Sequence, residues 1–189
     1  MIVQLAGLPC TGKSTVAAAL RDHLGPACLV LDKDRVRHAI YGTGHVEYSR
    51  SQDDFVVGLL HQAAARHLSE HPCATVILER TCTRAYQIAD VTSLTARIGQ
   101  PLAIIECVCP DHVARARLAS DHRRGEHPAA NRDFALYQEL KATAEPITIP
   151  TLRLRTDTPP ARSVARVLDY LGMNHAATEH SVPAAEGRP

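Results

Sequence analysis

Residues 7–14 read Gly-Leu-Pro-Cys-Thr-Gly-Lys-Ser and match the pattern G-x-x-x-x-G-K-[ST]. In such a loop the glycines let the backbone curl, so that several N–H groups converge on a polyphosphate. Lys13 would reach the β- and γ-phosphates, and the hydroxyl of Ser14 would take a place on Mg²⁺. The sequence therefore predicts a nucleotide site. Its predicted members are Gly7, Leu8, Pro9, Cys10, Thr11, Gly12, Lys13, Ser14 and Thr15.

The segments on either side of this loop supply the structural context that the motif needs. Residues 2–6 form a short, mostly apolar run of strand length. After the loop, Val16, Leu20 and Leu24 are spaced four apart, which is the spacing of one helix face. A strand, a glycine loop and a helix in this order are typical of a phosphate site at a helix N-terminus.

The rest of the chain alternates between apolar runs and helical patterns. Further strands are predicted at residues 28–31, 74–78 and 102–108, and within 147–155. Helices are predicted to start at residue 32, to span 52–70, 83–99, 111–124 and 161–171, and to end at 142. This alternation predicts an α/β fold with a five-stranded parallel sheet and helices on both faces. The domain would cover residues 1–171, and we expect the small, polar residues of the tail 172–189 to be disordered.

Charged residues directly follow two of the predicted strands. Asp32 and Asp34 come after the second strand, and Glu79 and Arg80 after the third. We expect Asp32 to cap the next helix, whereas Asp34 lies where an α/β sheet places its ligand crevice. For Glu79 and Arg80 a surface ion pair is the alternative, and we favour a place beside Mg²⁺ or substrate.

Composition limits the class of protein. A chain of 189 residues fits one domain, and its net charge of +1 argues against an electrostatic grip on long nucleic acid. The six cysteines show no paired spacing suited to zinc, and several lie in apolar runs, as reduced core residues of a cytoplasmic protein do. No apolar run is long enough to span a membrane.

A phosphate loop alone does not separate kinases from motors and switches, but three absences do. The guanine-reading sequence Asn-Lys-x-Asp of GTPases is missing, and the third strand ends in Glu-Arg rather than the Asp-Glu pair of motor ATPases. The chain is also too short for a motor ATPase with its helical lid domain. A compact phosphoryl-transfer enzyme remains.

Several segments together resemble the small P-loop kinases, a group with an adenylate-kinase-like fold. The group includes polynucleotide 5′-kinases, chloramphenicol phosphotransferase, gluconate kinases and zeta-type toxins. The resemblance covers residues 1–171 and implies ATP and Mg²⁺ as cofactors. It rests on residues 7–15, Asp34-x-x-Arg37, residues 115–125, residues 137–146 and Arg155-Thr-Asp-Thr-Pro159.

The resemblance also implies residue roles. Asp34 would lie next to the acceptor hydroxyl and accept its proton as a general base, while Arg37 would hold or orient the substrate. A small arginine-bearing lid would span about residues 117–132. In it, Arg117 would lie near the adenine, and Arg124 or Arg123 would stabilise charge on the phosphates.

Two further points follow from the resemblance. The loop that contains Asp157 would border the adenine. Related lids commonly carry two arginines four apart, whereas the position four after Arg117 is Asp121.

The leading hypothesis is an ATP-dependent kinase that acts on a hydroxyl of a small molecule, since near-neutral charge and few aromatic residues disfavour a strand acceptor. A polynucleotide 5′-hydroxyl or nucleotide kinase is the second, although nucleoside monophosphate kinases usually carry Gly-Phe-Pro-Arg where this chain has Glu79-Arg-Thr-Cys-Thr-Arg84. The third is a nucleotide-binding regulatory or toxin module whose ATP site is a switch. The sequence names neither the acceptor nor the oligomeric state.

Overall fold

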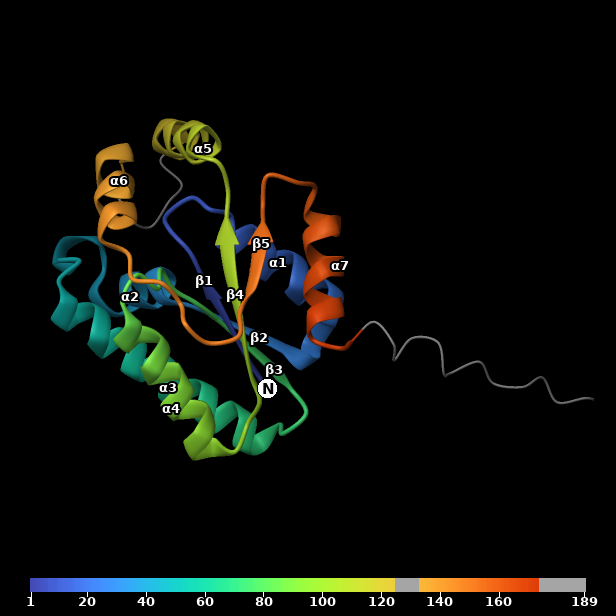
Figure 1. Cartoon of the computed structure of the whole chain (residues 1–189). Coiled ribbons are helices and arrows are strands. Elements are labelled where there is room, and N and C mark those ends of the chain that lie inside the picture. Colours follow the sequence, from blue (N-terminus) through green and yellow to red (C-terminus); the bar gives the residue numbers. More distant parts are fainter. Residues whose placement is uncertain (125–132, 174–189) are drawn as a thin grey trace, which may run out of the picture.

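The computed structural model describes residues 1–124 and 133–173 (Figure 1). Half of the predicted lid, residues 125–132, and nearly all of the predicted disordered tail lie outside these ranges. Five parallel strands form one sheet in the order β2-β3-β1-β4-β5. The strands are β1 (Ile2–Ala6), β2 (Cys28–Asp32), β3 (Thr75–Glu79), β4 (Leu102–Val108) and β5 (Leu152–Arg155).

Helices fill the connections between the strands. They are α1 (Lys13–Leu24), α2 (Lys33–Tyr41), α3 (Arg50–Glu70), α4 (Ala85–Ile98), α5 (Asp111–Arg124), α6 (Phe134–Thr143) and α7 (Pro160–Tyr170), with short 3-10 turns η1 (Gly25–Ala27) and η2 (Thr43–His45). The predicted α/β fold with a five-stranded parallel sheet is confirmed. Helix α3 begins two residues earlier than predicted, because the Ser49 side chain accepts a hydrogen bond from the backbone N–H of Gln52 and caps the helix there.

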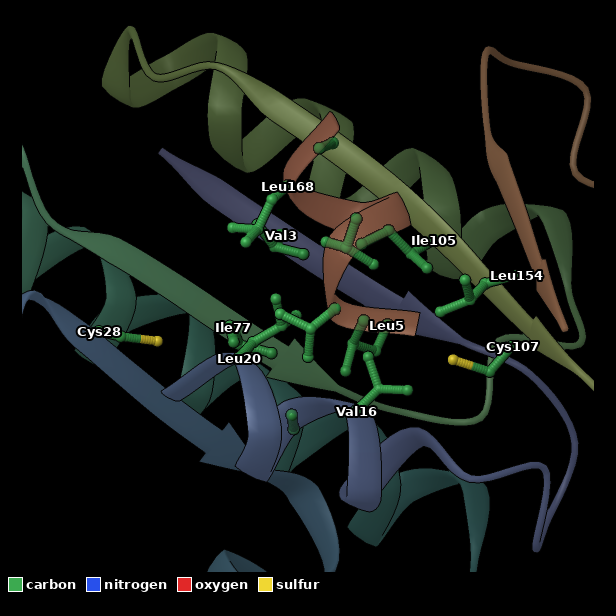
Figure 2. Packing of buried hydrophobic residues seen from close by; sticks show 14 residues of the cluster. Val3, Leu5, Val16, Leu20, Cys28, Ile77, Ile105, Cys107, Leu154 and Leu168 are labelled. Carbon is green, nitrogen blue, oxygen red and sulfur yellow. The ribbon is translucent and has the colours of Figure 1, made fainter. Parts of the chain in front are cut away.

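The helices cover both faces of the sheet, with α1 and α7 on one side and α3 and α4 on the other (Figure 1). The central strand β1 shows why. Its residues Val3 and Leu5 face the cluster that holds Val16 of α1 and Leu168 of α7 (Figure 2), whereas Ile2 belongs to the cluster on the opposite face. A strand buried on both faces needs apolar side chains almost throughout, which is the pattern that the sequence shows.

The carboxyl ends of the strands meet at one edge of the sheet. Glu79, the last residue of β3, is in register with Leu5 of β1 on one side and with Asp32 of β2 on the other. The loop after β1 and the start of α2 therefore lie on either side of Glu79. Helices α5 and α6 lie beyond this edge (Figure 1).

No helix within residues 1–124 and 133–173 has the length and apolar content needed to cross a membrane.

Candidate active site

The shape of the loop between β1 and α1 depends on its glycines. Gly7 has φ +137°, and a Cβ there would lie 2.4 Å from the carbonyl oxygen of Cys107. Gly12 has φ +87°, and Cys10 is a non-glycine residue with φ 58°. Only glycine fits at position 7, because its φ angle is unfavourable for residues with a side chain and the carbonyl oxygen of Cys107 occupies the space of a Cβ.

The lysine of the motif lies back over its own loop. Lys13 is 5% exposed, and its Nζ donates hydrogen bonds of 2.9 Å to the carbonyl oxygens of Gly7 and Leu8. The next residue, Ser14, donates from its hydroxyl to Oε1 of Glu79 at 2.5 Å. The predicted phosphate loop and the end of β3 are thus in direct contact.

A cavity of about 390 Å³ opens beside the loop, and we call it the loop cavity. Arg117 of α5 lies at its wall and donates to the carbonyl oxygens of Cys10 (3.3 Å) and Thr156 (2.7 Å). The Thr156 hydroxyl in turn donates to the carbonyl oxygen of Thr11 at 2.6 Å. The cavity is lined by Cys10, Gly12, Lys13, Ser14, Thr15, Val16, Glu79, Arg117, Asp121, Thr156, Thr158, Pro160 and Ser163.

A buried ionic cluster lies at the start of α2. Asp32 caps this helix by accepting from the backbone N–H groups of Asp34 and Arg35, as predicted. Arg37 is 1% exposed and donates to Oδ1 of Asp34 at 3.0 Å. One helical turn separates the two residues, so the spacing that the sequence shows puts them on the same face.

Asp53, from the first turn of α3, completes this cluster. It accepts a hydrogen bond of 2.7 Å from Nζ of Lys33 and forms an ion pair with Arg37. Lys33 also lies 3.8 Å from Oδ1 of Asp34. Two carboxylates and two cations are therefore held together at the carboxyl edge of the sheet.

Arg80 is buried rather than part of a surface ion pair. It is 5% exposed, and its Nη2 lies 3.4 Å from Oδ1 of Asp54, which also accepts from the hydroxyl of Tyr86 at 3.2 Å. The Nε atom of Arg80 has no hydrogen-bond partner within residues 1–124 and 133–173. This Nε atom is itself buried, so the donor points into the protein interior rather than into either cavity.

A second cavity, of about 580 Å³, has Asp53 in its lining, and we call it the tyrosine pocket. Arg37 lies 5.2 Å from the ring centroid of Tyr48, and Arg50 lies 4.6 Å from that of Tyr86. The pocket is lined by Tyr48, Arg50, Asp53, Arg84, Tyr86, Gln87 and Glu145.

The remaining predicted site residues lie as follows. The Asp157 carboxylate accepts hydrogen bonds from Arg155 at 3.1 and 2.6 Å, and these bonds lower its pKa. Its neighbours Thr156 and Thr158 line the loop cavity. Arg123 and Arg124 belong to α5, but their side chains lie outside the described part of the chain.

Two buried cysteines near the site have raised pKa values. All six cysteines are free, and burial raises the pKa of Cys82 to about 11 and that of Cys107 to about 12. A nucleophilic cysteine needs a lowered pKa, so neither thiol is suited to covalent chemistry.

Sequence reasoning did not select Asp53, Asp54, Tyr48, Tyr86 or Thr156 as individual site residues, although it expected the loop 156–159, which contains Thr156, to border the adenine. The two aspartates form a doublet in the first turn of a helix, where acids have an ordinary dipole explanation. Their distance in sequence from Arg37 and Arg80 hides the pairing. Tyr48 carries a signal only in the structure, where its φ of 52° is unusual for a residue other than glycine.

The comparisons with known proteins concern the family and the fold of the chain. The model of the AAA domain family (AAA_33) matches residues 2–147. The search of curated proteins found no match.

Several solved structures share the fold. A protein from Chloroflexus aurantiacus j-10-fl has a TM-score of 0.71 and 21% identity, covering 90% of this chain and 96% of that one. The APS kinase CysC of Mycobacterium tuberculosis, in complex with AMPPNP and APS, has a TM-score of 0.67 and 23% identity, covering 90% and 96%.

A gluconokinase from Sinorhizobium meliloti 1021 has a TM-score of 0.62 and 14% identity, covering 92% of this chain and 96% of its own. At such identities the likeness shows a shared fold. The matched family model covers well over half of the sequence, and the chain therefore belongs to the AAA domain family (AAA_33) and has the fold of the small P-loop kinases.

Proposed function

We propose that the protein is an ATP-dependent kinase that transfers the γ-phosphate to a hydroxyl group of a small molecule, with Asp34 as the general base. The observation that carries this proposal is the buried pair of Asp34 and Arg37 at the carboxyl edge of the sheet, with 3.0 Å between Oδ1 and Nη1. A carboxylate within reach of an acceptor hydroxyl orients it and accepts its proton as the O–P bond forms.

The loop cavity is suited to ATP. The glycine loop and the N-terminus of α1 direct backbone N–H groups at its floor, and Lys13 supplies a cation that can leave its own loop carbonyls for phosphate oxygens. Arg117 at the wall adds a second cation near the segment Thr156–Thr158. The similar APS kinase forms a complex with AMPPNP, an analogue of ATP, and this supports ATP as the nucleotide.

The residues present also fit Mg²⁺. Ser14 and Glu79 bring a hydroxyl and a carboxylate oxygen together at the cavity. Mg²⁺ in nucleotide sites takes one or two side-chain oxygens and otherwise phosphates and water, so no larger cluster of ligands is needed. When bound, the ion would neutralise charge on the β- and γ-phosphates.

The acceptor would bind on the α2–α3 side. Arg37 and Arg80 are buried guanidinium groups there, and Arg37 lies against Tyr48, which lines the tyrosine pocket. The free state of all six cysteines fits the cytoplasmic location that we propose with this function.

A pair of variants tests the proposal. With γ-labelled ATP, Mg²⁺ and a mixed panel of hydroxyl acceptors, Lys13→Ala and Asp34→Ala should each abolish transfer, and Asp34→Ala should leave ATP binding largely unchanged. Label that reaches one acceptor class and disappears in both variants supports the kinase. Slow ATP hydrolysis that depends neither on the acceptor nor on Asp34 would instead support the nucleotide switch. Label on 5′-hydroxyl oligonucleotides would support the polynucleotide kinase.

A further inference from the structure

The tyrosine pocket lies against the buried ionic cluster at the start of α2, because Asp53 belongs to both. The residues that line the pocket restrict the chemistry of a ligand bound there. Resting on the proposed kinase function, we propose that the acceptor is an uncharged polyhydroxylated ring, such as a sugar or a cyclitol, bound in this pocket.

Among residues 1–124 and 133–173, none with an aliphatic side chain lines this pocket. Its seven residues are two tyrosines, two arginines, two acids and one glutamine. Small-molecule sites are usually lined mostly by apolar groups with a few polar ones, so this pocket is unsuited to a largely apolar alcohol. A ring hydroxyl both donates and accepts a hydrogen bond, and it is matched by a wall that offers carboxylates and guanidinium groups side by side.

The charges of the lining cancel. Arg84 lies 3.5 Å from Glu145, and Arg50 lies 3.5 Å from Asp54 beside the pocket. Asp53 is paired with Lys33 and Arg37. Sites for phosphate or carboxylate ligands concentrate arginines whose forks bind the anion. Here an anionic acceptor would meet a carboxylate beside each guanidinium, which disfavours nucleotides and phosphorylated sugars.

The tyrosines supply the part of the site that suits the C–H face of a ring. A tyrosine ring offers an apolar body with a polar end, and both Tyr48 and Tyr86 are half-buried at the wall. Tyr48 holds its left-handed backbone conformation with its ring against Arg37. Backbone strain of this kind is found mostly at active sites and ligand-binding sites, where the surrounding structure holds the residue in place.

Asp53 connects the pocket to the proposed base. It lines the pocket, and it shares both Lys33 and Arg37 with Asp34. A hydroxyl at this end would lose its proton to Asp34 as its oxygen forms a bond to the γ-phosphorus. The bond from that phosphorus to the bridging oxygen breaks at the same time, and ADP leaves with the electron pair.

The test compares acceptors that differ in charge and in polarity. We would measure kcat/KM with ATP and Mg²⁺ for D-glucose, myo-inositol, D-glucuronate, glucose 6-phosphate, AMP, a 5′-hydroxyl oligonucleotide and benzyl alcohol, and identify products by mass. A neutral ring should be preferred by at least about tenfold over every charged or apolar acceptor. Preference for any of the other small molecules overturns this inference but leaves the proposed kinase standing, whereas preference for the oligonucleotide supports the polynucleotide kinase and overturns both proposals. No transfer to any acceptor by protein that binds ATP overturns both.

Two variants test the charge argument. In the parent protein the backbone N–H of Ala85 donates to Oε2 of Glu145 at 2.6 Å. Glu145→Gln keeps an oxygen for this hydrogen bond but removes the carboxylate that pairs with Arg84. The ratio of kcat/KM for D-glucuronate over D-glucose should rise several-fold in this variant and fall in Arg84→Gln. Glu139→Gln, an exposed change on α6 outside the pocket, should leave the ratio as in the parent protein. An unchanged ratio in both pocket variants would contradict the proposal.

Discussion

Ser14 and Glu79 are 65 residues apart in the chain, and the hydroxyl of the first donates to the carboxylate of the second at 2.5 Å. The register of the sheet brings them together, because Glu79 lies beside Leu5, just before the phosphate loop. Both oxygens line the loop cavity. This contact makes the Mg²⁺ requirement the first property to measure.

Glu79→Gln should raise the Mg²⁺ concentration needed for half-maximal turnover by about tenfold, since loss of a ligand or of its supporting group typically costs 10–100-fold in affinity. A Mg²⁺ titration at fixed ATP measures the change. Glu106→Gln is the control, because Glu106 faces Arg153 and does not line the loop cavity. An unaltered Mg²⁺ dependence would remove Glu79 from the proposed metal site.

Arg117→Ala should weaken ATP binding by about 10- to 100-fold, because a charge-assisted contact is worth about 1.5–3 kcal/mol. Calorimetric titration with AMPPNP measures the dissociation constant. Arg115→Ala, two residues earlier on the same helix, removes a guanidinium 4.4 Å from the Phe134 ring and outside the loop cavity. Equal effects of the two variants would show that only the packing of α5 matters.

Asp53→Asn should destabilise the fold by about 3 kcal/mol, because it removes a carboxylate from Lys33 and from Arg37, which is 1% exposed. Urea unfolding measures this free energy. Asp22→Asn, in an exposed pair with Arg21, should change stability by less than about 0.5 kcal/mol. If Asp53→Asn is equally mild, the cluster is not held by Asp53.

Gly7→Ala should destabilise by at least about 2 kcal/mol, since φ +137° and the Cys107 carbonyl oxygen 2.4 Å from a new Cβ both oppose a side chain. Gly58→Ala is the matched control, because this helical glycine has no atom within 4 Å of an added Cβ. It should stabilise by about 0.5–1 kcal/mol. Urea midpoints of the two variants should therefore move in opposite directions.

Asp111 couples stability to pH. Hydrogen bonds from Lys141 and Tyr137 lower its pKa below the ordinary 3.8. A lowered folded-state pKa stabilises the fold above the unfolded pKa, and this contribution is lost as the pH falls through the folded one. The stability difference between the parent protein and Asp111→Asn, measured by urea unfolding, should therefore shrink below about pH 4. Lys141→Met should reproduce this pH profile, and a difference that stays constant would contradict it.

The sequence identified those features whose cause is local. The phosphate loop is one continuous motif, and Asp34 and Arg37 are one turn apart. The inner strands β1 and β3 are apolar because both of their faces are buried. Pairings between distant segments were not predictable. Asp53 reaches Arg37 only through the packing of α3 on α2, and Thr156 bonds to Thr11 across 145 residues. Asp53 and Asp54 also lie near the start of a helix, where acids are expected for their interaction with the helix dipole. Nothing in the sequence therefore predicted their contacts with Arg37 and Arg80.

The strand order has a consequence for how the chain is made. The first strand, β1, has β3 and β4 as its neighbours, and β2 has only β3. During synthesis β1 and the phosphate loop emerge early, but no parallel partner exists until residues 75–79 have left the ribosome. All strand pairing in the sheet is thus between segments far apart in the sequence. Such pairing slows folding, and the apolar strands stay exposed until their partners have been synthesised. Ribosome-bound chains that end before β3 will therefore carry an unpaired, aggregation-prone β1.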